Sequence, residues 1–209
     1  PGSQVDVVDG GGHLWTARLI PGDQLELTTD RAQPLKTGSK PMPQLGLAMA
    51  LVRRGMDDVM RMACELGVDH VQPIQADRSV PQAEDRPERW GVILQEAVEQ
   101  SERLWRPDLQ PCIQSEQWWM ALAAEDLRLI AVTRDAGCPH LETWLHQTAG
   151  PAPRIWLAIG PEGGWSEREV AWALASGWIG VTLGDTILRS STAAVAGISA
   201  LCSWRTLSA

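Results

Sequence analysis

The chain of 209 residues lacks phenylalanine and tyrosine altogether, although it contains 11 tryptophans and 6 methionines. Tryptophan and methionine therefore stand at positions where a large apolar core residue is expected, for example in "GMDDV" and "SGWIG". The apolar fraction is still 44 %, which is enough for a sizeable core. A chain of this length suits one medium domain, or one domain with a small appendage.

The chain also lacks the features of membrane and secreted proteins. No apolar run approaches the length of a membrane span, and the first residues, "PGSQVDVVDGGG", form neither a signal peptide nor a lipidation signal. The four cysteines are scattered and include no C-x-x-C pair, which is typical of reduced thiols in the cytosol. We therefore expect a cytoplasmic protein without a membrane partner.

Metal ligands and an excess of positive charge are missing as well. The four histidines form no H-E-x-x-H motif, and the spacing of His140 and His146 puts them on different faces of a helix. The sequence thus predicts no metal site. The net charge of -8 argues against a chain-wide electrostatic grip on nucleic acid, although it is compatible with a local basic face.

The chain divides into two parts with different patterns. Residues 1–28 alternate in three short segments, "SQVDVVD", "HLWTARLI" and "QLELTT", which predict three strands of a small β domain. Residues 28–44, rich in proline and lysine, predict a linker. From Leu45 onward, apolar strand-like runs alternate with helical patterns. This alternation predicts an α/β fold with a parallel sheet covered on both faces.

In such sheets, ligands bind beyond the carboxyl ends of the strands. The first candidate turn, Gly160–Gly164, follows "RIWLAI" and precedes a helix that Ser166 and Glu169 start as a capping box and Gly177 ends. We expect Ser166 and Glu169 only to start this helix. The turn has neither the spacing of a phosphate-binding loop nor that of a dinucleotide fingerprint, and Glu162 would repel a phosphate. It therefore suits a neutral or cationic ligand, unless it merely packs helix on strand.

A second candidate turn lies in "LGDTILRSSTAAVAG" (183–197), where a strand ends at Leu183. Ser191 is expected to cap the helix that follows, whose small residues allow close approach of another backbone. That helix is either a packed core helix or an oligomer contact. Arg189 is expected at the mouth of the same sheet edge, although an ordinary surface arginine is the alternative.

Taken together, the two turns resemble the paired signatures of the RsmE family, the small-subunit ribosomal RNA uridine-N3 methyltransferases of the SPOUT superfamily. Three further stretches resemble blocks of that family: "RGMDDVMRMACELGVDHVQPIQADRSV" (54–80), "EAVEQSERLWRPDLQP" (96–111) and "VDVVDGGGHLWTARL" (5–19). The last resembles the latter part of the family's N-terminal PUA-like barrel.

The resemblance implies a SPOUT-type parallel sheet with a C-terminal trefoil knot in residues 38–209. It also implies that residues 1–37 are the remainder of the PUA-like β domain. The implied activity is methylation of N3 of a uridine in 16S ribosomal RNA by S-adenosylmethionine. The implied partners are small-subunit ribosomal RNA or the assembling 30S subunit, and a second copy of the chain.

The resemblance also implies roles for individual residues. Arg189 is the candidate catalytic residue, because a cation beside the uracil carbonyls would stabilise the deprotonated base. Arg78 is the candidate RNA contact, and a surface salt bridge with Asp77 or a neighbour is the alternative. The glutamate of the first turn suits the cationic sulfonium of the cofactor. The candidate cofactor-binding residues are Thr133, Ile159, Gly160, Glu162, Gly163, Gly164, Leu183, Gly184, Ile187, Leu188 and Thr192.

The chain departs from the family pattern at three places. Met62 stands where the family usually has a lysine, Ser191 stands where it often has a glutamate, and the arginine-rich N-terminal strand is absent. These departures affect the expected RNA contacts rather than the glycine turns. Two alternatives stay open, which are a related ribose 2′-O-methyltransferase and a homologue that binds RNA without catalysis.

Overall fold

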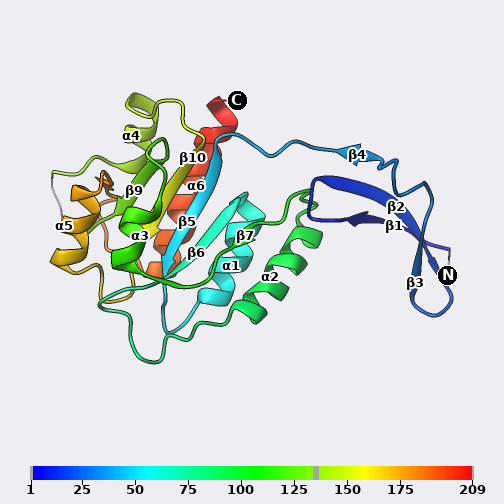
Figure 1. The fold of residues 1–209 in the computed structure, drawn as a ribbon, viewed down its shortest axis with the longest axis horizontal. Helices are drawn as coiled ribbons and strands as arrows, with labels where there is room; N and C mark the ends of the chain where they lie inside the picture. The colour runs from blue at the N-terminus through cyan, green and yellow to red at the C-terminus, as the bar shows by residue number, and fades with distance from the viewer. Residues whose placement is uncertain (1, 134–136, 209) are drawn as a thin grey trace.

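The computed structural model describes residues 2–133 and 137–208, and it contains a large parallel sheet and a small antiparallel one (Figure 1). The strands of the parallel sheet have the order β11-β9-β10-β5-β6-β7, and β8 also pairs with β6. Their bounds are β5 Gln44–Ala50, β6 His70–Gln75, β7 Asp108–Leu109, β8 Ile113–Gln114, β9 Leu127–Ala131, β10 Arg154–Ile159 and β11 Ile179–Val181. The predicted α/β class is confirmed.

Helices cover both faces of this sheet, as the strand–helix alternation predicts. The bounds are α1 Met56–Leu66, α2 Pro87–Gln100, α3 Ser115–Ala121, α4 Leu141–Gln147, α5 Glu167–Ala175 and α6 Ser190–Ser208. Buried side chains of α1, α2, α4 and α6 share one core, and those of α3 and α5 share the other. Figure 1 shows α3 and α5 on the opposite side of the sheet from α1 and α2.

The two cores follow from the two-residue period of the strands. Leu45, Leu47 and Met49 of β5 point into the first core, whereas Ala48 and Ala50 point into the second. Small side chains on the second face leave room for a layer of indole rings, which belong to Trp118, Trp119, Trp156, Trp165 and Trp178. This layer explains how a chain without phenylalanine or tyrosine fills that side of the sheet.

Helix α6 lies very close to the centre of the sheet. A Cβ on Gly197 would stand 2.3 Å from a methyl carbon of Leu157 in β10, so only glycine fits at this point of α6. Near the other end of the helix, Arg205 donates a hydrogen bond to the buried carboxylate of Asp69 at 2.6 Å. Arg103 donates to the second oxygen of the same carboxylate at 3.3 Å. The C-terminal helix is therefore fixed both at its middle and near its end.

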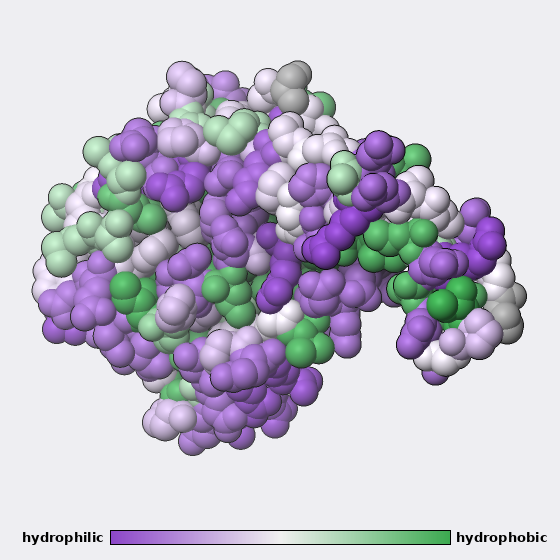
Figure 2. All heavy atoms as spheres, turned by 45° about the vertical axis from the view of Figure 1, so that its right-hand side comes forward, coloured by the Kyte–Doolittle hydropathy of each residue, from purple (hydrophilic) through white to green (hydrophobic). Residues whose placement is uncertain are grey.

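The N-terminal part forms a four-stranded antiparallel sheet of β1 Gln4–Val8, β2 His13–Ile20, β3 Gln24–Leu27 and β4 Lys36–Thr37. Strand β4 pairs with β2, so the prediction that residues 28–44 are only a linker is wrong. The sheet meets the larger part through Gly12, whose N–H donates to Leu104, and through Trp105, whose indole donates to Gly38. Figure 2 shows this sheet as an arm that stands away from the main body.

The inner side of this arm forms an open hollow of about 790 Å³. Its lining is mostly apolar, with the polar side chains of Asp9, His13, Arg31 and Thr37 among them. No loop at the carboxyl ends of the parallel strands contributes to the hollow. In the described ranges, no helix combines the length and the apolar character needed to cross a membrane.

Candidate functional site

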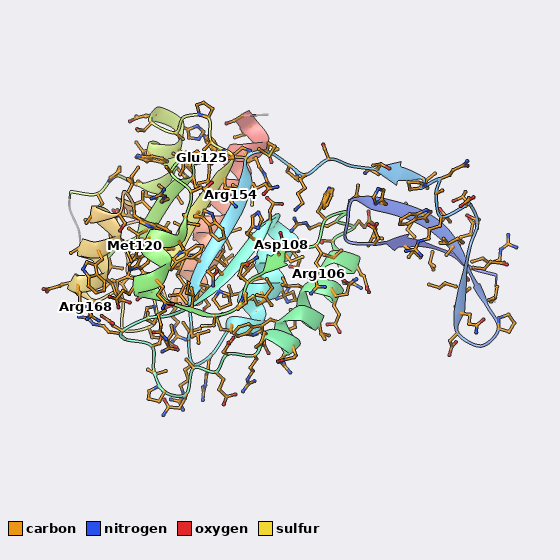
Figure 3. The ribbon with its side chains drawn as sticks, in the orientation of Figure 1. Arg106, Asp108, Met120, Glu125, Arg154 and Arg168 are labelled. Atoms are coloured by element: carbon orange, nitrogen blue, oxygen red, sulfur yellow. The ribbon has the colours of Figure 1, made fainter. Side chains whose placement is uncertain are left out.

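Both candidate turns leave the same edge of the parallel sheet. Gly160–Gly164 follows β10, and residues 183–189 follow β11. Thr133 lies two residues beyond β9, the strand between β10 and β11. The structure therefore brings the three segments to the carboxyl ends of neighbouring strands, where ligands bind in open α/β sheets. In Figure 3, Arg154 marks the amino edge of the sheet and Arg168 lies near the carboxyl edge.

The first turn is tight and closely packed. The backbone N–H of Gly164 closes it by donating to the carbonyl three residues earlier at 2.8 Å, and Gly164 itself has a left-handed φ of 68°. A Cβ on Gly160 would lie 3.3 Å from the indole of Trp165, and a Cβ on Gly163 would lie 3.0 Å from the Cβ of Arg78. These glycines therefore allow the turn to lie directly against its neighbours.

The helix behind the turn begins as the sequence predicts. The hydroxyl of Ser166 accepts a hydrogen bond from the N–H of Glu169, whose carboxylate accepts one from the N–H of Ser166. At the other end, Gly177 has a φ of 84° and follows the C-cap Ser176. The predicted capping box and C-terminal stop are confirmed.

Glu169 nevertheless does more than start a helix, so the expectation of a capping role alone is wrong. The residue is only 1 % exposed. Its Oε1 atom accepts hydrogen bonds from the backbone N–H of Asp77 at 3.0 Å and from the hydroxyl of Ser115 at 2.7 Å. Glu169 thus joins α5 to the loop after β6 and to the start of α3.

Two further contacts attach the first turn to neighbouring loops. The Oε1 atom of Glu162 accepts a hydrogen bond from the backbone N–H of Arg53, just after β5, at 2.9 Å. The Nη1 atom of Arg78, just after β6, donates to the carbonyls of Gly163 and Trp165, each at 3.2 Å. The carboxylate of Glu162 therefore links the turn to the segment after β5, and Arg78 links it to the segment after β6.

Among the described residues, Arg78 forms no salt bridge with Asp77 or with a neighbour, so that alternative is wrong. The carboxylate of Asp77 accepts hydrogen bonds from the hydroxyl of Ser166 at 2.6 Å and from Arg168 at 2.7 Å. The Ser166 hydrogen bond and the nearby Arg168 charge hold the pKa of Asp77 below its usual value. Asp77 is therefore an additional link between the β6 loop and the first turn of α5.

The second turn is anchored at its start and open in its middle. Thr182 donates its N–H to Pro139 and accepts from the N–H of Leu141, so the segment after β11 pairs with the segment after β9. Gly184 has a φ of 137°, a conformation that side chains rarely adopt. The side chain of Ile187 is 61 % exposed, so it is accessible to a ligand.

Helix α6 starts directly after this turn. It begins at Ser190, so Ser191 lies in the first helical turn and the prediction that it caps the helix is wrong. Thr192 lies in the same turn and is exposed, while Leu188 is half-buried. Arg189 is exposed, and its side chain has no hydrogen bond or ion pair with any described residue.

The predicted cofactor residues differ in what they offer a ligand. The side chain of Ile159 is 1 % exposed and belongs to the core under α6, so only its main chain is available. Gly184 and Thr133 are exposed, and Leu183 is half-buried. Within residues 2–133 and 137–208, no group of histidine, cysteine and carboxylate side chains has the geometry of a metal site.

Sequence reasoning missed Arg53 and Ser115. Arg53 contributes its backbone N–H rather than its side chain, so residue type carries no signal for this contact. Ser115 meets Glu169 from a position 54 residues earlier, and only the fold brings the two together.

Comparisons with known proteins show the family to which the chain is similar. A family model described as an RNA methyltransferase domain matches residues 39–202. The ribosomal RNA small subunit methyltransferase E of Synechocystis sp. is 40 % identical over 205 residues, covering 93 % of this chain and 65 % of that protein. The protein of the same name from Mycobacterium bovis is 28 % identical, with coverage of 94 % and 86 %.

A solved structure is similar over nearly the whole chain. It is the ribosomal RNA small subunit methyltransferase E of Neisseria gonorrhoeae bound to S-adenosyl methionine, with a TM-score of 0.81 and 30 % identity. The superposition covers 97 % of this chain and 84 % of that one. This chain spans slightly less than two thirds of the Synechocystis protein, at 65 % of its length.

Proposed function

This chain belongs to the RsmE family of RNA methyltransferases, and we propose that it transfers a methyl group from S-adenosylmethionine to N3 of a uridine in 16S ribosomal RNA. Its α/β fold is close to the structures of SPOUT methyltransferases. The observation that carries the proposal is the meeting of Gly160–Gly164, Thr133 and residues 183–189 at the ends of three neighbouring strands.

The residues of the first turn fit this cofactor. A Cβ on Gly164 would have nothing within 4 Å, so a ligand can approach the main chain closely at this glycine. The exposed carboxylate of Glu162 favours a cation such as a sulfonium and disfavours a phosphate. When bound, S-adenosylmethionine supplies an electrophilic methyl group. The chain's contribution is mainly to align donor and acceptor, which lowers the barrier of a displacement reaction by several kcal/mol or more.

The acceptor atom, N3 of the uridine, must lose its proton before it can take the methyl group. Uridine N3 carries a proton, and removing it at neutral pH costs roughly 4 kcal/mol if its pKa is about three units above ambient. A cation near the uracil carbonyls would stabilise the resulting anion. Arg189 suits this role, because it follows the second turn directly, is exposed, and has no competing partner among the described residues.

Arg189→Ala tests the role of this arginine. We expect the rate of methyl transfer to fall about a hundredfold, as for the loss of one group that stabilises developing charge. The dissociation constant for S-adenosylmethionine should stay within about twofold, because the arginine acts on the acceptor. Arg189→Lys keeps the charge and should recover part of the rate. Lost cofactor binding with unimpaired residual turnover would contradict the role.

At the carboxyl edge, exposed arginines such as Arg78 and Arg189 lie among exposed carboxylates such as Asp77, Glu162 and Asp185. RNA binding by this acidic chain would therefore rest on individual arginines rather than on a basic face. We propose that Arg78 contacts the RNA backbone. The reactive uridine has to leave its stack to reach the site, so single-stranded or looped RNA of the small subunit or assembling 30S particle is the expected substrate.

The methylated atom is decided by mass spectrometry of ribosomal RNA from a deletion strain, with and without the gene restored. N3-methyluridine that is lost on deletion and regained on complementation supports the proposal. A missing ribose 2′-O-methyl group would instead favour the first alternative enzyme. Calorimetry with S-adenosylmethionine addresses the second alternative, because a homologue without catalysis that has lost its cofactor site would show no binding.

We propose three further properties from the family resemblance. The C-terminal segments form a trefoil knot, an idea supported by the strand order, in which α6 returns from edge strand β11 to pack on β10 and β5. Residues 1–37 are the later part of a PUA-like barrel and residues 38–209 the methyltransferase domain, in line with the antiparallel sheet and its open hollow. The protein is a homodimer, which light scattering can test. Its cytoplasmic location is proposed from the sequence and not from the resemblance.

A further inference from the structure

We infer that Arg78 is a positioning residue for the turn Gly160–Gly164, in addition to the RNA contact proposed above. The inference rests on the proposed function, because it concerns the turn that would hold S-adenosylmethionine. Arg78 lies 85 positions before Gly163 and reaches it across the end of β5, the strand between β6 and β10. Its guanidinium would therefore act on the cofactor through the shape of the turn and without touching the cofactor.

The contact between Arg78 and the turn has two parts. Its Nη1 atom donates to two carbonyls, those of Gly163 and Trp165, which lie on either side of the left-handed Gly164. Its Cβ atom lies beside Gly163, because a Cβ added to that glycine would be only 3.0 Å from it. Arg78 thus fixes both the orientation of two peptide groups and the distance of the turn from β6.

The loop that carries Arg78 is itself fixed, so the arginine has a firm base. On one side of it, the N–H of Asp77 donates to the buried carboxylate of Glu169. On the other side, the hydroxyl of Ser79 donates to the carbonyl of Leu51 at 3.2 Å. Without the Arg78 side chain, residues 160–164 would keep one hydrogen bond to a neighbouring loop of the described structure, that between Glu162 and Arg53. Ser166, just beyond the turn, would still donate to Asp77.

This brace uses only part of the guanidinium. The Nε and Nη2 atoms of Arg78 make no hydrogen bond with residues 2–133 or 137–208, and the residue is exposed. These two nitrogens can meet an RNA phosphate while Nη1 holds the turn. One arginine would then belong to both sites, so the cofactor turn and the RNA surface would share a residue.

The decisive measurement is the affinity for S-adenosylmethionine in the absence of RNA, by calorimetry on the full chain. We expect Arg78→Ala to weaken binding by about tenfold, the effect of losing one hydrogen bond from a charged donor. Arg78→Lys keeps a donor and should recover part of this loss. Arg54→Ala is the matched control, because it removes an exposed arginine of the same edge whose side chain has no partner in the described structure.

The possible outcomes separate the two proposals. If the wild-type chain binds the cofactor and Arg78→Ala binds it within twofold of wild type, Arg78 is at most an RNA contact and the inference is overturned. If Arg54→Ala weakens binding as much as Arg78→Ala, general charge is the cause and the inference is overturned as well. A wild-type chain that does not bind S-adenosylmethionine would instead count against the proposed function. Circular dichroism establishes that each variant is folded, and Arg78→Lys provides the same test if the alanine variant is not.

Discussion

The carboxylate of Glu162 accepts a hydrogen bond from the backbone N–H of Arg53, 109 residues earlier in the chain. This bond joins the ends of β10 and β5, two strands that pair side by side in the sheet. Glu162, the one charged residue of the glycine turn, therefore has a structural partner. Its negative charge also suits a sulfonium. The two roles can be separated by experiment.

Glu162→Gln keeps an oxygen that can accept from Arg53 and removes the negative charge. We expect the affinity for the cationic S-adenosylmethionine to fall about two- to fivefold, the usual range for an exposed charge pair. The affinity for S-adenosylhomocysteine, which has no sulfonium charge, should change less. Calorimetry with both ligands measures the difference, and an equal loss for the two would show that the charge has no specific role.

Glu169→Ala should destabilise the protein by about 3 kcal/mol, because three donors lose a buried acceptor. The donors are the hydroxyl of Ser115 and the N–H groups of Asp77 and Ser166. Glu167→Ala removes an exposed carboxylate from the same helical turn and should cost less than about 1 kcal/mol. Urea unfolding measures both, and similar losses would refute the bridging role of Glu169.

Two tryptophans of the second core should respond differently to the same change. The indole N–H of Trp178 donates to the carbonyl of Trp119 at 3.2 Å, whereas the buried N–H of Trp156 has no partner among the described residues. Both substitutions remove the same atoms, but only Trp178→Phe removes an existing hydrogen bond. Trp178→Phe should therefore lower the free energy of unfolding by about 1 kcal/mol more than Trp156→Phe. A larger loss for Trp156→Phe in denaturant unfolding would contradict this reasoning.

Burial raises the pKa of the Cys202 thiol to about 11. Thiolate is the reactive form, so only about one thiol in a thousand would be ionised at pH 8. We expect iodoacetamide to leave Cys202 unmodified at pH 8 in the folded protein and to modify it at the same pH in urea. Peptide mass spectrometry measures the extent, and rapid modification of the folded chain at pH 8 would disprove the expectation.

Local features of the site could be predicted from the sequence, and features that join distant segments could not. The capping box of Ser166 and Glu169 lies within one helical turn, so its spacing alone predicts it. The contact of Arg78 with Gly163 depends on the order of the strands, which residue spacing does not fix. The same reason explains why the second role of Glu169 and the contact of Arg53 were missed.

The N-terminal part shows why a very short strand cannot be predicted from the sequence. Proline, lysine and glycine in residues 28–44 predict a linker, yet two residues of this segment, Lys36 and Thr37, pair with β2. A strand of two residues has no periodicity of its own, and its hydrogen bonds come entirely from its partner. The α/β alternation after Leu45 is easier to predict, because strands such as β5 and β10 carry enough apolar residues to show a pattern, whereas β7 and β8, with two residues each, do not.

The position of β10 has a consequence for how the chain folds during its own synthesis. Strand β5 stands at the centre of the sheet, and one of its edges pairs with β10, where Arg154 lies opposite Gln44. That edge stays open for about 5–20 s at the usual rates of elongation, because the partner strand is made so much later. Arg205 reaches Asp69 from 136 positions away, so α6 can join this part of the fold only after those further residues have been made. During that interval the apolar strand β5 has a free edge, and free edges of this kind are where partly made chains tend to associate.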